Sequence, residues 1–504
     1  MTNHLFDAIR SRMPGPDRVF ATTADGEVLT YGGLLDLSAR LAHVLAACNV
    51  CAGDRVLLQA EKSLTALVLY LACVRAGAVF LPLNPSYTTA ELDYFLKDAE
   101  PGLVVCDPAR EAFASERGIR TLTLDHVGGG SLMDLAQSCS ADFRDASRDA
   151  DDLAAILYTS GTTGRSKGAM LTHENLLSNA KTLAEIWRFS SQDALLHALP
   201  VYHSHGLFVA TNTALISGAS MIFLPRFDAD QVVKHLKDAT VMMGVPTFYT
   251  RLLNHPGLTQ EAVRHMRLFI SGSAPLLAET HRQWLERTGH AVLERYGLTE
   301  TNMNTSNPHD GERRPGSVGF PLPGVDLRIV HAETGSPLPQ GEIGMIEVKG
   351  PNVCHGYWRN IEKTQTEFRE DGFFITGDLG LVDQEGYVHI VGRAKDLVIT
   401  GGFNVYPKEV ESEIDALPGV LESAVFGVAH PDLGEGVTAA VVSDGTTVLS
   451  ETLILAGLLQ RLAKFKLPKR VLIVDELPRN AMGKVQKNLL REQVKDIYRN
   501  DASL

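Results

Sequence analysis

The first hundred residues carry apolar side chains at two different spacings. Helical spacing, with an apolar residue at every third or fourth position, is shown by Leu34, Leu37, Leu41, Val44 and Leu45. Continuous apolar runs at 55–60 and 78–83 predict buried strands, and the run at 64–74 predicts a buried helix between them. Strands that alternate with helices in this way indicate a parallel sheet covered by helices.

The pattern changes twice further along the chain. A stretch rich in Gly, Ser and Asp at 128–152 predicts an exposed connector, and the alternation of strands and helices resumes at Leu153. Near the C-terminus, strands are predicted at 387–391 and 397–400, followed by a helix at 407–417 that opens with a proline.

We therefore predict an α/β fold with two domains. Layered α/β subdomains would form a large N-terminal domain, residues 1–393, and residues 394–504 would form a small, mobile α+β C-terminal domain. The boundary is placed in the charged turn Arg393–Asp396, between the last two predicted strands.

Composition narrows the class of protein. The 504 residues contain 47 Lys+Arg against 60 Asp+Glu, a formal net charge of −13, which argues against a nucleic acid as partner. The hydrophobic content of 44% is typical of a globular protein. Arg75 and Gly77 interrupt the most apolar stretch, 64–83, so that no uncharged run reaches the length of a membrane span.

The cysteines and the N-terminus bear on the compartment. The six cysteines are Cys48, Cys51, Cys73, Cys106, Cys139 and Cys354. They are too few for a disulfide framework, and no second pair or histidine cluster follows the CxxC spacing at 48–51, which disfavours redox or zinc use. Leu5, Phe6 and Ile9 with two arginines faintly resemble a transit peptide, but an early acid and early prolines weigh against it. We predict a cytoplasmic protein with no membrane and no obligate protein partner.

The strongest local signal is the sequence YTSGTTGRSKG at 158–168, directly after the predicted strand 153–157. Its glycines and hydroxyl groups can wrap an oligophosphate, with Lys167 as the counter-charge. The motif is not a Walker A motif, because Ser166 stands where the second glycine is needed and Gly168 follows the lysine. A plain linker is the alternative, and the buried strand and the embedded lysine favour phosphate binding.

A second candidate for phosphate contact is the basic segment 464–491. Its eight basic residues, set against Asp475 and Glu476, are Lys464, Lys466, Lys469, Arg470, Arg479, Lys484, Lys487 and Arg491. A phosphate-facing surface and a merely solvated basic face are both compatible with this composition.

With seven further motifs, the glycine-rich loop resembles the acyl-adenylate-forming superfamily, which includes acyl-CoA synthetases, nonribosomal-peptide adenylation domains and beetle luciferases. The motifs follow the superfamily's order along the chain: LPVYHSHG (199–206), SGSAPL (271–276), RYGLTET (295–301), TGD (376–378), GRAKD (392–396), GGFNVYPKEVE (401–411) and PRNAMGKVQK (478–487). The resemblance covers essentially the whole chain. It implies that ATP converts a carboxylic acid to an acyl-AMP and that a thiol then displaces AMP.

The resemblance also assigns ATP-binding residues. They are Thr159, Ser160, Gly161, Thr162, Thr163, Gly164, Lys167, Ser271, Gly272, Ser273, Ala274, Glu294, Tyr296, Gly297, Thr299, Asp378 and Arg393. Residues 271–275 and Tyr296 would form the adenine pocket, and Asp378 with Arg393 would hold the ribose. An ionised carboxylate only accepts hydrogen bonds, which suits the two hydroxyl donors of a ribose. Taken alone, Asp378 could be a helix cap.

Magnesium and catalysis are implied in the same way. Thr159 and Glu300 would lie at Mg²⁺, which prefers oxygen ligands, although Glu300 alone could be a surface acid. Lys484 follows Gly483 in a segment that resembles the superfamily's mobile catalytic loop, where a cation would neutralise charge that builds during adenylation. An ordinary surface lysine is the alternative.

The second half-reaction would use a different part of the C-terminal domain. Lys395 matches the superfamily's hinge, where a few residues that change φ and ψ would exchange Lys484 for the Gly401–Gly402 loop. In the relatives that loop flanks the tunnel for the pantetheine thiol of CoA. A simple β-turn is the alternative for the two glycines.

The segments expected to line the acid site are polar, unlike the long apolar pocket of a fatty-acid-activating enzyme. Arg251 lies in GVPTFYTR, and Arg295 stands where the wider family commonly has a small or neutral residue. Guanidinium groups bind carboxylates with two hydrogen bonds, so these arginines favour a substrate with a second carboxylate. A structural ion pair is the alternative for each arginine. His203 is predicted to shape the acid site; His203 and His205 could share a strand face, but no third metal ligand is evident.

These segments resemble those of malonyl-CoA synthetases. We therefore predict that malonate is ligated to CoA at the expense of ATP, through malonyl-AMP, with Mg²⁺ as the metal. Methylmalonate or another small carboxylate, or a carrier-protein thiol in place of CoA, are the alternatives. A nucleotide-sensing scaffold is disfavoured by the presence of Lys484, Glu300 and Asp378, and a luciferase-like oxygenase is separable by measuring oxygen use and light.

Overall fold

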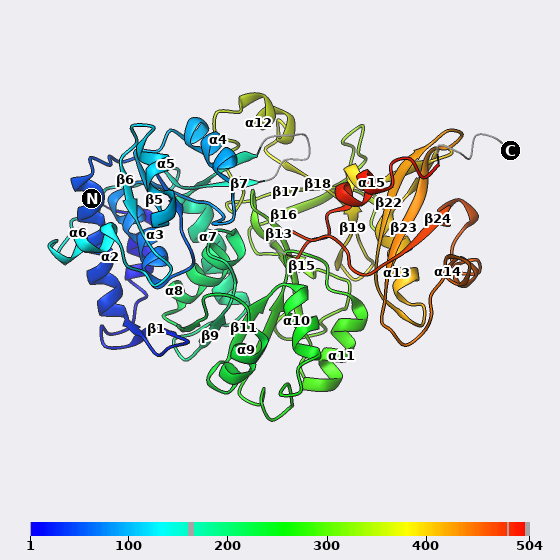
Figure 1. The fold of residues 1–504 in the computed structure, drawn as a ribbon, viewed down its shortest axis with the longest axis horizontal. Coiled ribbons are helices and arrows are strands. Elements are labelled where there is room, and N and C mark those ends of the chain that lie inside the picture. The colour runs from blue at the N-terminus through cyan, green and yellow to red at the C-terminus, as the bar shows by residue number, and fades with distance from the viewer. Residues whose placement is uncertain (1, 160–165, 481–482, 499–504) are drawn as a thin grey trace. The chain divides into compact units, whose positions relative to one another are not determined.

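The computed structural model describes residues 2–159, 166–480 and 483–498 (Figure 1). The chain divides into two compact units. The first unit comprises Met1–Leu327 and Val348–Phe374, and the second comprises Arg328–Glu347 and Ile375–Leu504. The mixed α/β class and the large N-terminal part with a smaller C-terminal part are confirmed. Residues 375–393 group with the second unit in this division. The domain boundary predicted at residue 393 stays a prediction.

A six-stranded sheet in the first unit has the strand order β6-β5-β3-β4-β7-β8. Its strands are β3 (Arg55–Gln59), β4 (Val79–Pro82), β5 (Leu103–Cys106), β6 (Thr121–Thr123), β7 (Leu153–Thr159) and β8 (Lys167–Thr172). All neighbours are parallel except β7 and β8. The predicted parallel sheet is therefore confirmed, and β3, β4 and α3 (Leu64–Ala76) end within two residues of their predicted bounds.

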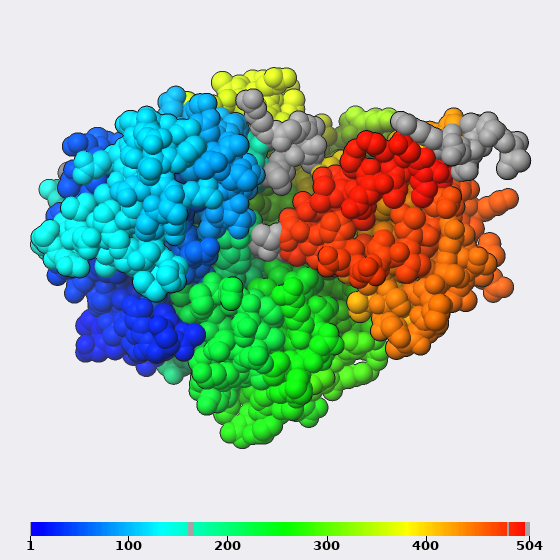
Figure 2. All heavy atoms as spheres, in the orientation of Figure 1, coloured from blue at the N-terminus to red at the C-terminus, as the bar shows by residue number. Residues whose placement is uncertain are grey.

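A nine-stranded sheet has the order β15-β14-β13-β12-β11-β9-β10-β1-β2. Its strands are β1 (Val19–Thr23), β2 (Val28–Thr30), β9 (Ala194–His197), β10 (Ser220–Phe223), β11 (Val241–Gly244), β12 (Leu268–Ser271), β13 (Leu293–Leu298), β14 (Asn302–Ser306) and β15 (Phe320–Pro321). Strand β1 pairs in parallel with β10. On the surface, blue atoms from the start of the chain accordingly lie against green atoms from its middle (Figure 2). Strands β11, β12 and β13 are parallel neighbours, which places their carboxyl ends at one sheet edge.

Helices connect these strands. Those of the first unit are α1 (His4–Arg10), α2 (Tyr31–Ala47), α3, α4 (Thr89–Ala99), α5 (Glu111–Ser115), α6 (Ser131–Gln137), α7 (His173–Ile186), α8 (Thr213–Ser217), α9 (Ala229–His235), α10 (Pro246–Leu253), α11 (Ala278–Thr288) and α12 (Ile361–Glu367), with the short helices η1 (Pro108–Arg110) and η3 (Leu236–Asp238). Helix α3 is apolar on all sides because it packs against α2 as well as lying over the sheet, and its ends are set by Ser63, which caps Ala66, and by the left-handed Gly77.

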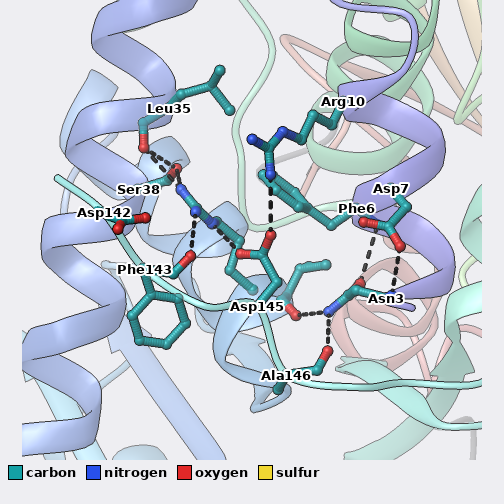
Figure 3. A network of polar contacts seen from close by, with 12 residues as sticks. Asn3, Phe6, Asp7, Arg10, Leu35, Ser38, Asp142, Phe143, Asp145 and Ala146 are labelled. Carbon is teal, nitrogen blue, oxygen red and sulfur yellow. Dashed lines mark hydrogen bonds and ion pairs between the residues drawn. The ribbon is translucent and has the colours of Figure 1, made fainter. Parts of the chain in front are cut away.

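The prediction of an exposed connector over all of 128–152 is wrong for its first part. Helix α6 occupies Ser131–Gln137 and buries Leu132 and Ala136, two residues at the four-residue spacing of one helix face. The later part is extended but held in place: Arg75 donates to Asp145 at 2.6 Å and to the Phe143 carbonyl at 3.3 Å (Figure 3). Buried hydrogen bonds therefore hold a segment that its composition marks as a loop.

The second unit contains a four-stranded sheet and a C-terminal sheet. The strands of the first are β16 (Asp326–Val330), β17 (Gly344–Lys349), β18 (Phe374–Val382) and β19 (Val388–Arg393); those of the second are β20 (Val398–Thr400), β21 (Phe403–Val405), β22 (Val420–His430), β23 (Gly434–Ser443) and β24 (Arg470–Val474). Its helices are η4 (Ala394–Asp396), α13 (Pro407–Asp415), α14 (Glu451–Leu458), η5 (Lys464–Lys466) and α15 (Lys487–Gln493). Val425 of β22 lies in one apolar cluster and its neighbours Ala424 and Phe426 lie in another, so this sheet is covered on both faces.

Among the helices in the described ranges, none is both long enough and apolar enough to span a membrane.

Candidate active site

A buried arginine lies in strand β13 of the first unit. Arg295 is 3% exposed and pairs in register with Ser306 of β14. Its Nε and Nη2 atoms have no hydrogen-bond partner in the described part of the chain. Burial lowers the pKa of Arg295 to about 9, because the interior solvates a positive charge less well than water does. The side chain remains a cation at neutral pH, in a position where a buried charge ordinarily has an anionic partner.

A glycine provides the space for this guanidinium. Gly272 follows β12, and a Cβ atom built on it would lie 2.3 Å from Cζ of Arg295. The backbone of the SGSAPL segment can approach the arginine only because this residue has no side chain. Tyr249 of α10 is fully buried and acts electrostatically on Arg295, but its hydroxyl donates to the Ile270 carbonyl at 2.6 Å.

Two histidines add further unpartnered polar atoms. His205 begins η2 (His205–Asn212), a helical segment with wide π-type turns, and His203 lies in the turn before it, so the two histidines do not share a strand face. Nδ1 of His205 lies 3.1 Å from Oγ of Ser273. The Nε2 atoms of both histidines and Oγ of Ser271 have no partner among the residues the structure describes. Arg295, His203, His205, Ser271 and Ser273 are together called the Arg295 cluster.

The Arg295 cluster carries one net positive charge, that of Arg295. Burial lowers the pKa of His203 to about 4, and burial together with the charge of Arg295 lowers the pKa of His205. Both imidazoles are therefore neutral near pH 7. The cluster thus combines one buried cation with neutral groups that can donate or accept hydrogen bonds, which is a suitable site for a carboxylate.

The structure places Arg251 differently from Arg295. Arg251 is exposed in the last turn of α10, a helix whose buried side is formed by Phe248, Tyr249 and Leu252. Its predicted contact with the substrate carboxylate stays a prediction.

The predicted magnesium residues lie close together at the end of β7. Oγ1 of Thr159 lies 3.4 Å from Oε1 of Glu300. The Tyr357 hydroxyl donates to a Glu367 carboxylate oxygen and lies 3.1 Å from the same Glu300 oxygen. Nζ of Lys167 lies 3.6 Å from Oε1 of Glu367, which brings the predicted counter-charge into this group.

A hydroxyl and one carboxylate fit Mg²⁺, which keeps several waters and takes its remaining ligands from substrate phosphates. Within the described ranges, no set of three or more His, Cys, Asp or Glu side chains could hold a metal by itself. The other predicted residues of the glycine-rich loop, Ser160, Gly161, Thr162, Thr163 and Gly164, lie outside the described residues.

The predicted adenine pocket and three further predicted ATP-binding residues, Glu294, Gly297 and Thr299, gather at the carboxyl ends of β12 and β13. Ser271, Gly272, Ser273 and Ala274 end or follow β12, whereas Glu294, Tyr296, Gly297 and Thr299 lie in β13 or follow it. Ser271 and Glu294 pair in register, and the Glu294 carboxylate accepts a hydrogen bond from the Gly316 amide at 3.2 Å. Carboxyl ends of parallel strands are the usual edge for ligands in α/β sheets. Adenine binding itself stays a prediction.

The predicted ribose pair is assembled within one hairpin of the second unit. Asp378 of β18 and Arg393 of β19 pair in register, and Nε of Arg393 lies 2.7 Å from Oδ1 of Asp378. Asp378 is 4% exposed, and its amide donates to Oγ1 of Thr376 at 3.1 Å. Because Asp378 lies inside a strand, it is not a helix cap.

Lys484 shares its surroundings with this pair. The residue is exposed, and its amide donates to Oδ1 of Asn480 at 3.0 Å. The pKa of its amine is lowered, first because nearby protein atoms reduce its hydration and then because of the positive charge of Arg393; Lys395 acts in the same direction and Asp378 in the opposite one. Three residues with predicted roles in the second unit thus influence the proposed catalytic lysine.

The remaining predictions concern exposed loops of the second unit. Gly401 and Gly402 join β20 and β21 and have φ of 56° and 81°, values that a two-residue hairpin turn requires. Their role toward CoA stays a prediction. Much of the basic segment 464–491 is paired within the unit: Lys466 with Glu409, Lys487 with Glu411, Arg479 with Glu422 and Arg491 with Asp396. These ion pairs favour the reading of a solvated face for those four residues.

The two cysteines of the CxxC spacing lie in different surroundings. Cys48 is buried, Cys51 is exposed, and all six cysteines are free thiols.

Comparison with known proteins agrees with this geometry. Residues 10–358 match the model of the AMP-binding enzymes, and residues 409–484 match that of the AMP-binding enzyme C-terminal domain. The chain belongs to the AMP-binding enzyme family.

Several members of this family are similar over almost their full length. The malonate–CoA ligase of Arabidopsis thaliana is 34% identical, over 95% of this chain and 87% of that protein. A feruloyl-CoA synthase of an Amycolatopsis species is 37% identical, over 93% of this chain and 94% of that protein. The crystal structure of ATP-bound MatB from Rhodopseudomonas palustris is 62% identical with a TM-score of 0.97, and the match covers 99% of this chain and 100% of that one.

Sequence reasoning missed some residues of this AMP-binding enzyme. Tyr357 and Glu367, which link Glu300 to Lys167, were not singled out, although GYW at 356–358 is a conspicuous aromatic cluster. His205 was considered only as a metal ligand, yet its contact with Ser273 makes it part of the Arg295 cluster. Neither spacing nor composition could reveal contacts between residues so far apart in the chain.

Proposed function

We propose that this AMP-binding enzyme converts malonate, ATP and CoA to malonyl-CoA, AMP and pyrophosphate. The buried, unpaired guanidinium of Arg295 carries the proposal. A monocarboxylic acid has one carboxylate, and that group must react with ATP. A dicarboxylate has a second one, which can supply the anion that Arg295 lacks.

The relatives support this substrate class without deciding it. The similar proteins include a malonate–CoA ligase and, at 35% identity, an oxalate–CoA ligase of Arabidopsis thaliana, both named for dicarboxylates. The feruloyl-CoA synthase is 37% identical, so overall identity at this level does not fix the acid. The Arg295 cluster is the local feature of this chain that favours a dicarboxylate.

In the first half-reaction, one carboxylate of malonate attacks the α-phosphorus of ATP. The new P–O bond gives malonyl-AMP, and the bond to the β-phosphate breaks to release pyrophosphate. Lys484 neutralises negative charge that builds on the phosphate and carboxylate oxygens, and Asp378 accepts hydrogen bonds from the ribose. Mg²⁺, which Thr159 and Glu300 would hold, neutralises further phosphate charge when it is bound.

In the second half-reaction, the thiol of CoA attacks the acyl carbon of malonyl-AMP. The C–S bond forms, the C–O bond to AMP breaks, and the thiol proton leaves to solvent. Throughout both steps, Arg295 holds the carboxylate that does not react, so one acid site serves the whole cycle.

Product identification tests the proposal directly. The protein is incubated with ATP, Mg²⁺, CoA and, one at a time, malonate, methylmalonate, oxalate, succinate, acetate and butyrate, and thioesters are identified by mass. Malonyl-CoA as the main product supports the proposal. Preferred formation of acetyl- or butyryl-CoA would overturn it, and malonate-dependent release of pyrophosphate without thioester would point to another thiol acceptor.

The proposed compartment is the cytoplasm. Six free cysteines, of which Cys51 is exposed, suit a reducing environment.

A further inference from the structure

A second buried cation lies in the first unit. Lys62 is 7% exposed, and its Nζ donates to the carbonyls of His197 and Leu224 at 2.8 and 2.6 Å. The same atom lies 2.9 Å from Nδ1 of His197 and 4.2 Å from the centre of the Phe223 ring. None of the ion pairs found in the described residues includes it. Three acceptors and an aromatic face thus surround an ammonium group that burial makes costly.

These contacts select one tautomer of His197. Nε2 of His197 lies 2.9 Å from the Gly206 carbonyl, which can only accept, so Nε2 carries the proton. His197 is 1% exposed, and burial lowers its pKa to about 3, so the ring is neutral and Nδ1 has no proton. Nδ1 must therefore accept a hydrogen bond, and Lys62 supplies the donor.

The Gly206 carbonyl in turn holds the turn that carries the two histidines of the Arg295 cluster. Oγ1 of Thr211 also donates to this carbonyl, at 3.0 Å, and the Leu207 amide donates to the His203 carbonyl at 2.9 Å. A Cβ atom on Gly206 would lie 2.1 Å from the Pro200 carbonyl oxygen, so the chain folds back on itself very tightly here. Small changes at Gly206 therefore move its neighbour His205.

We propose that Lys62 is a positioning residue for the acid site. It holds His197 as the Nε2–H tautomer, His197 holds the Gly206 carbonyl, and the turn at 203–206 is thereby kept in place beside Arg295. This inference rests on the proposed function only in taking the Arg295 cluster as the place where the acid binds. Without the ammonium group, His197 can move its proton to Nδ1 or rotate, and the Gly206 carbonyl then keeps Thr211 Oγ1 as a donor but loses His197.

Lys62→Met tests the proposal, because methionine has a similar length and no N–H donor. We expect KM for the acid to rise at least tenfold, KM for ATP to change less than twofold, and the melting temperature to fall, because two buried carbonyls and Nδ1 of His197 lose their donor. A purely structural lysine would also lower the melting temperature, but it would leave the two KM values unchanged or change them together. That outcome would overturn the proposal.

His197 variants test the same chain of contacts at its second link. His197→Gln keeps an amide donor for the Gly206 carbonyl, whereas His197→Phe keeps the ring and loses both nitrogens. We expect His197→Phe to raise the acid KM as much as Lys62→Met does, and His197→Gln to raise it less. The double variant Lys62→Met/His197→Phe should be no worse than either single variant. If the effects of the two single variants on the acid KM multiply in the double variant, Lys62 and His197 do not act through the same contacts, and the proposal fails.

Arg75→Met is the matched control. Arg75 is also a buried cation of the first unit, with Asp145, Ser38 and the Leu35 carbonyl as partners, none of which has a proposed role in the site (Figure 3). This variant should lower the melting temperature and leave both KM values within twofold. All assays use the acid that the wild-type enzyme turns over best. If that acid is not malonate, the proposed function fails while the test of Lys62 proceeds.

Discussion

The two arginines predicted to meet substrate differ in what surrounds them. Arg295 of the first unit is buried and has unpartnered nitrogens, whereas Arg393 of the second unit is half-buried and bound to Asp378 at 2.7 Å. A site that lacks an anion suits an anionic ligand, and a site that supplies its own carboxylate suits hydroxyl donors. We therefore propose that Arg295 holds the free carboxylate of the acid and that the Asp378–Arg393 pair holds the ribose.

The two arginines should also differ in how much their substitution affects the stability of the protein. Removing one partner of an established pair leaves the other charge uncompensated, whereas removing a cation that has no partner leaves nothing behind. Substitutions in the Asp378–Arg393 pair should therefore cost stability as well as function. Substitutions at Arg295 should cost function alone.

The largest effect is expected at Lys484, which lies beside the paired arginine. Lys484→Ala should lower malonate-dependent pyrophosphate release at least about 10³-fold, because the charge that builds during adenylation is no longer neutralised. Conversion of supplied malonyl-AMP and CoA to malonyl-CoA should continue.

Lys487→Ala is the control, because Lys487 is occupied by Glu411 at 2.6 Å. It should change neither half-reaction more than about twofold. Equal loss of both half-reactions in Lys484→Ala would contradict its assignment to the first step alone.

Asp378→Asn tests whether the Asp378–Arg393 pair serves the nucleotide and Arg295 the acid. It removes the charged partner of Arg393, so KM for ATP should rise about tenfold, which corresponds to about 1.4 kcal/mol, and the melting temperature should fall. KM for malonate should stay within about twofold. A comparable rise in KM for malonate would mean that the pair serves the acid rather than the nucleotide. Glu409→Gln, which breaks the Lys466–Glu409 pair of the same unit, controls for the loss of an ion pair.

Arg251→Ala measures whether a second arginine assists the first. Arg251 is exposed, so water already solvates it, and its loss should lower kcat/KM for malonate only about fivefold. Combined with a change at Arg295, the double variant should lose less than the product of the two single effects. Strict multiplication would show that the two arginines do not hold the same carboxylate.

The smallest effect concerns Asp415 of α13, a carboxylate whose pKa burial raises to about 7, against the nearby charge of Lys408. The folded state therefore binds the proton more tightly than the unfolded state does. The contribution of Asp415 to stability is fully present below the ordinary Asp pKa near 4 and is lost as the pH rises through about 7. Asp415→Asn can still accept a hydrogen bond from Ser423 Oγ. In chemical unfolding experiments, this variant should lose about 1 kcal/mol or more of the decrease in unfolding free energy that the wild-type protein shows between about pH 4 and about pH 7. An unchanged slope would mean that other groups cause it.

The sequence predicted those parts of the fold in which apolar runs are continuous. Strands β3 and β4 and helix α3 were located because every side of them is buried. Helix α6 was missed because its two buried residues lie in a stretch whose glycines and serines indicate a loop. Arg295 and the Asp378–Arg393 pair were found because motifs mark them.

Lys62 could not be predicted. It follows an acid in the sequence and resembles a surface residue, and its partners His197 and Leu224 are 135 and 162 positions away. Only the pairing of β9 with β10 brings those two partners together. Sequence patterns report local burial, whereas the contacts of a buried lysine depend on the sheet topology.

The selectivity of Arg295 is the most direct test of the central claim. The measurement is kcat/KM for malonate and for butyrate in the wild-type enzyme and in Arg295→Met. The wild-type enzyme should prefer malonate by about 10⁴, because butyrate leaves the buried guanidinium unpaired. Arg295→Met should lower kcat/KM for malonate at least about 10²-fold, hold or raise that for butyrate, and keep the melting temperature. Unchanged kcat/KM for malonate in a folded Arg295→Met enzyme would contradict the account.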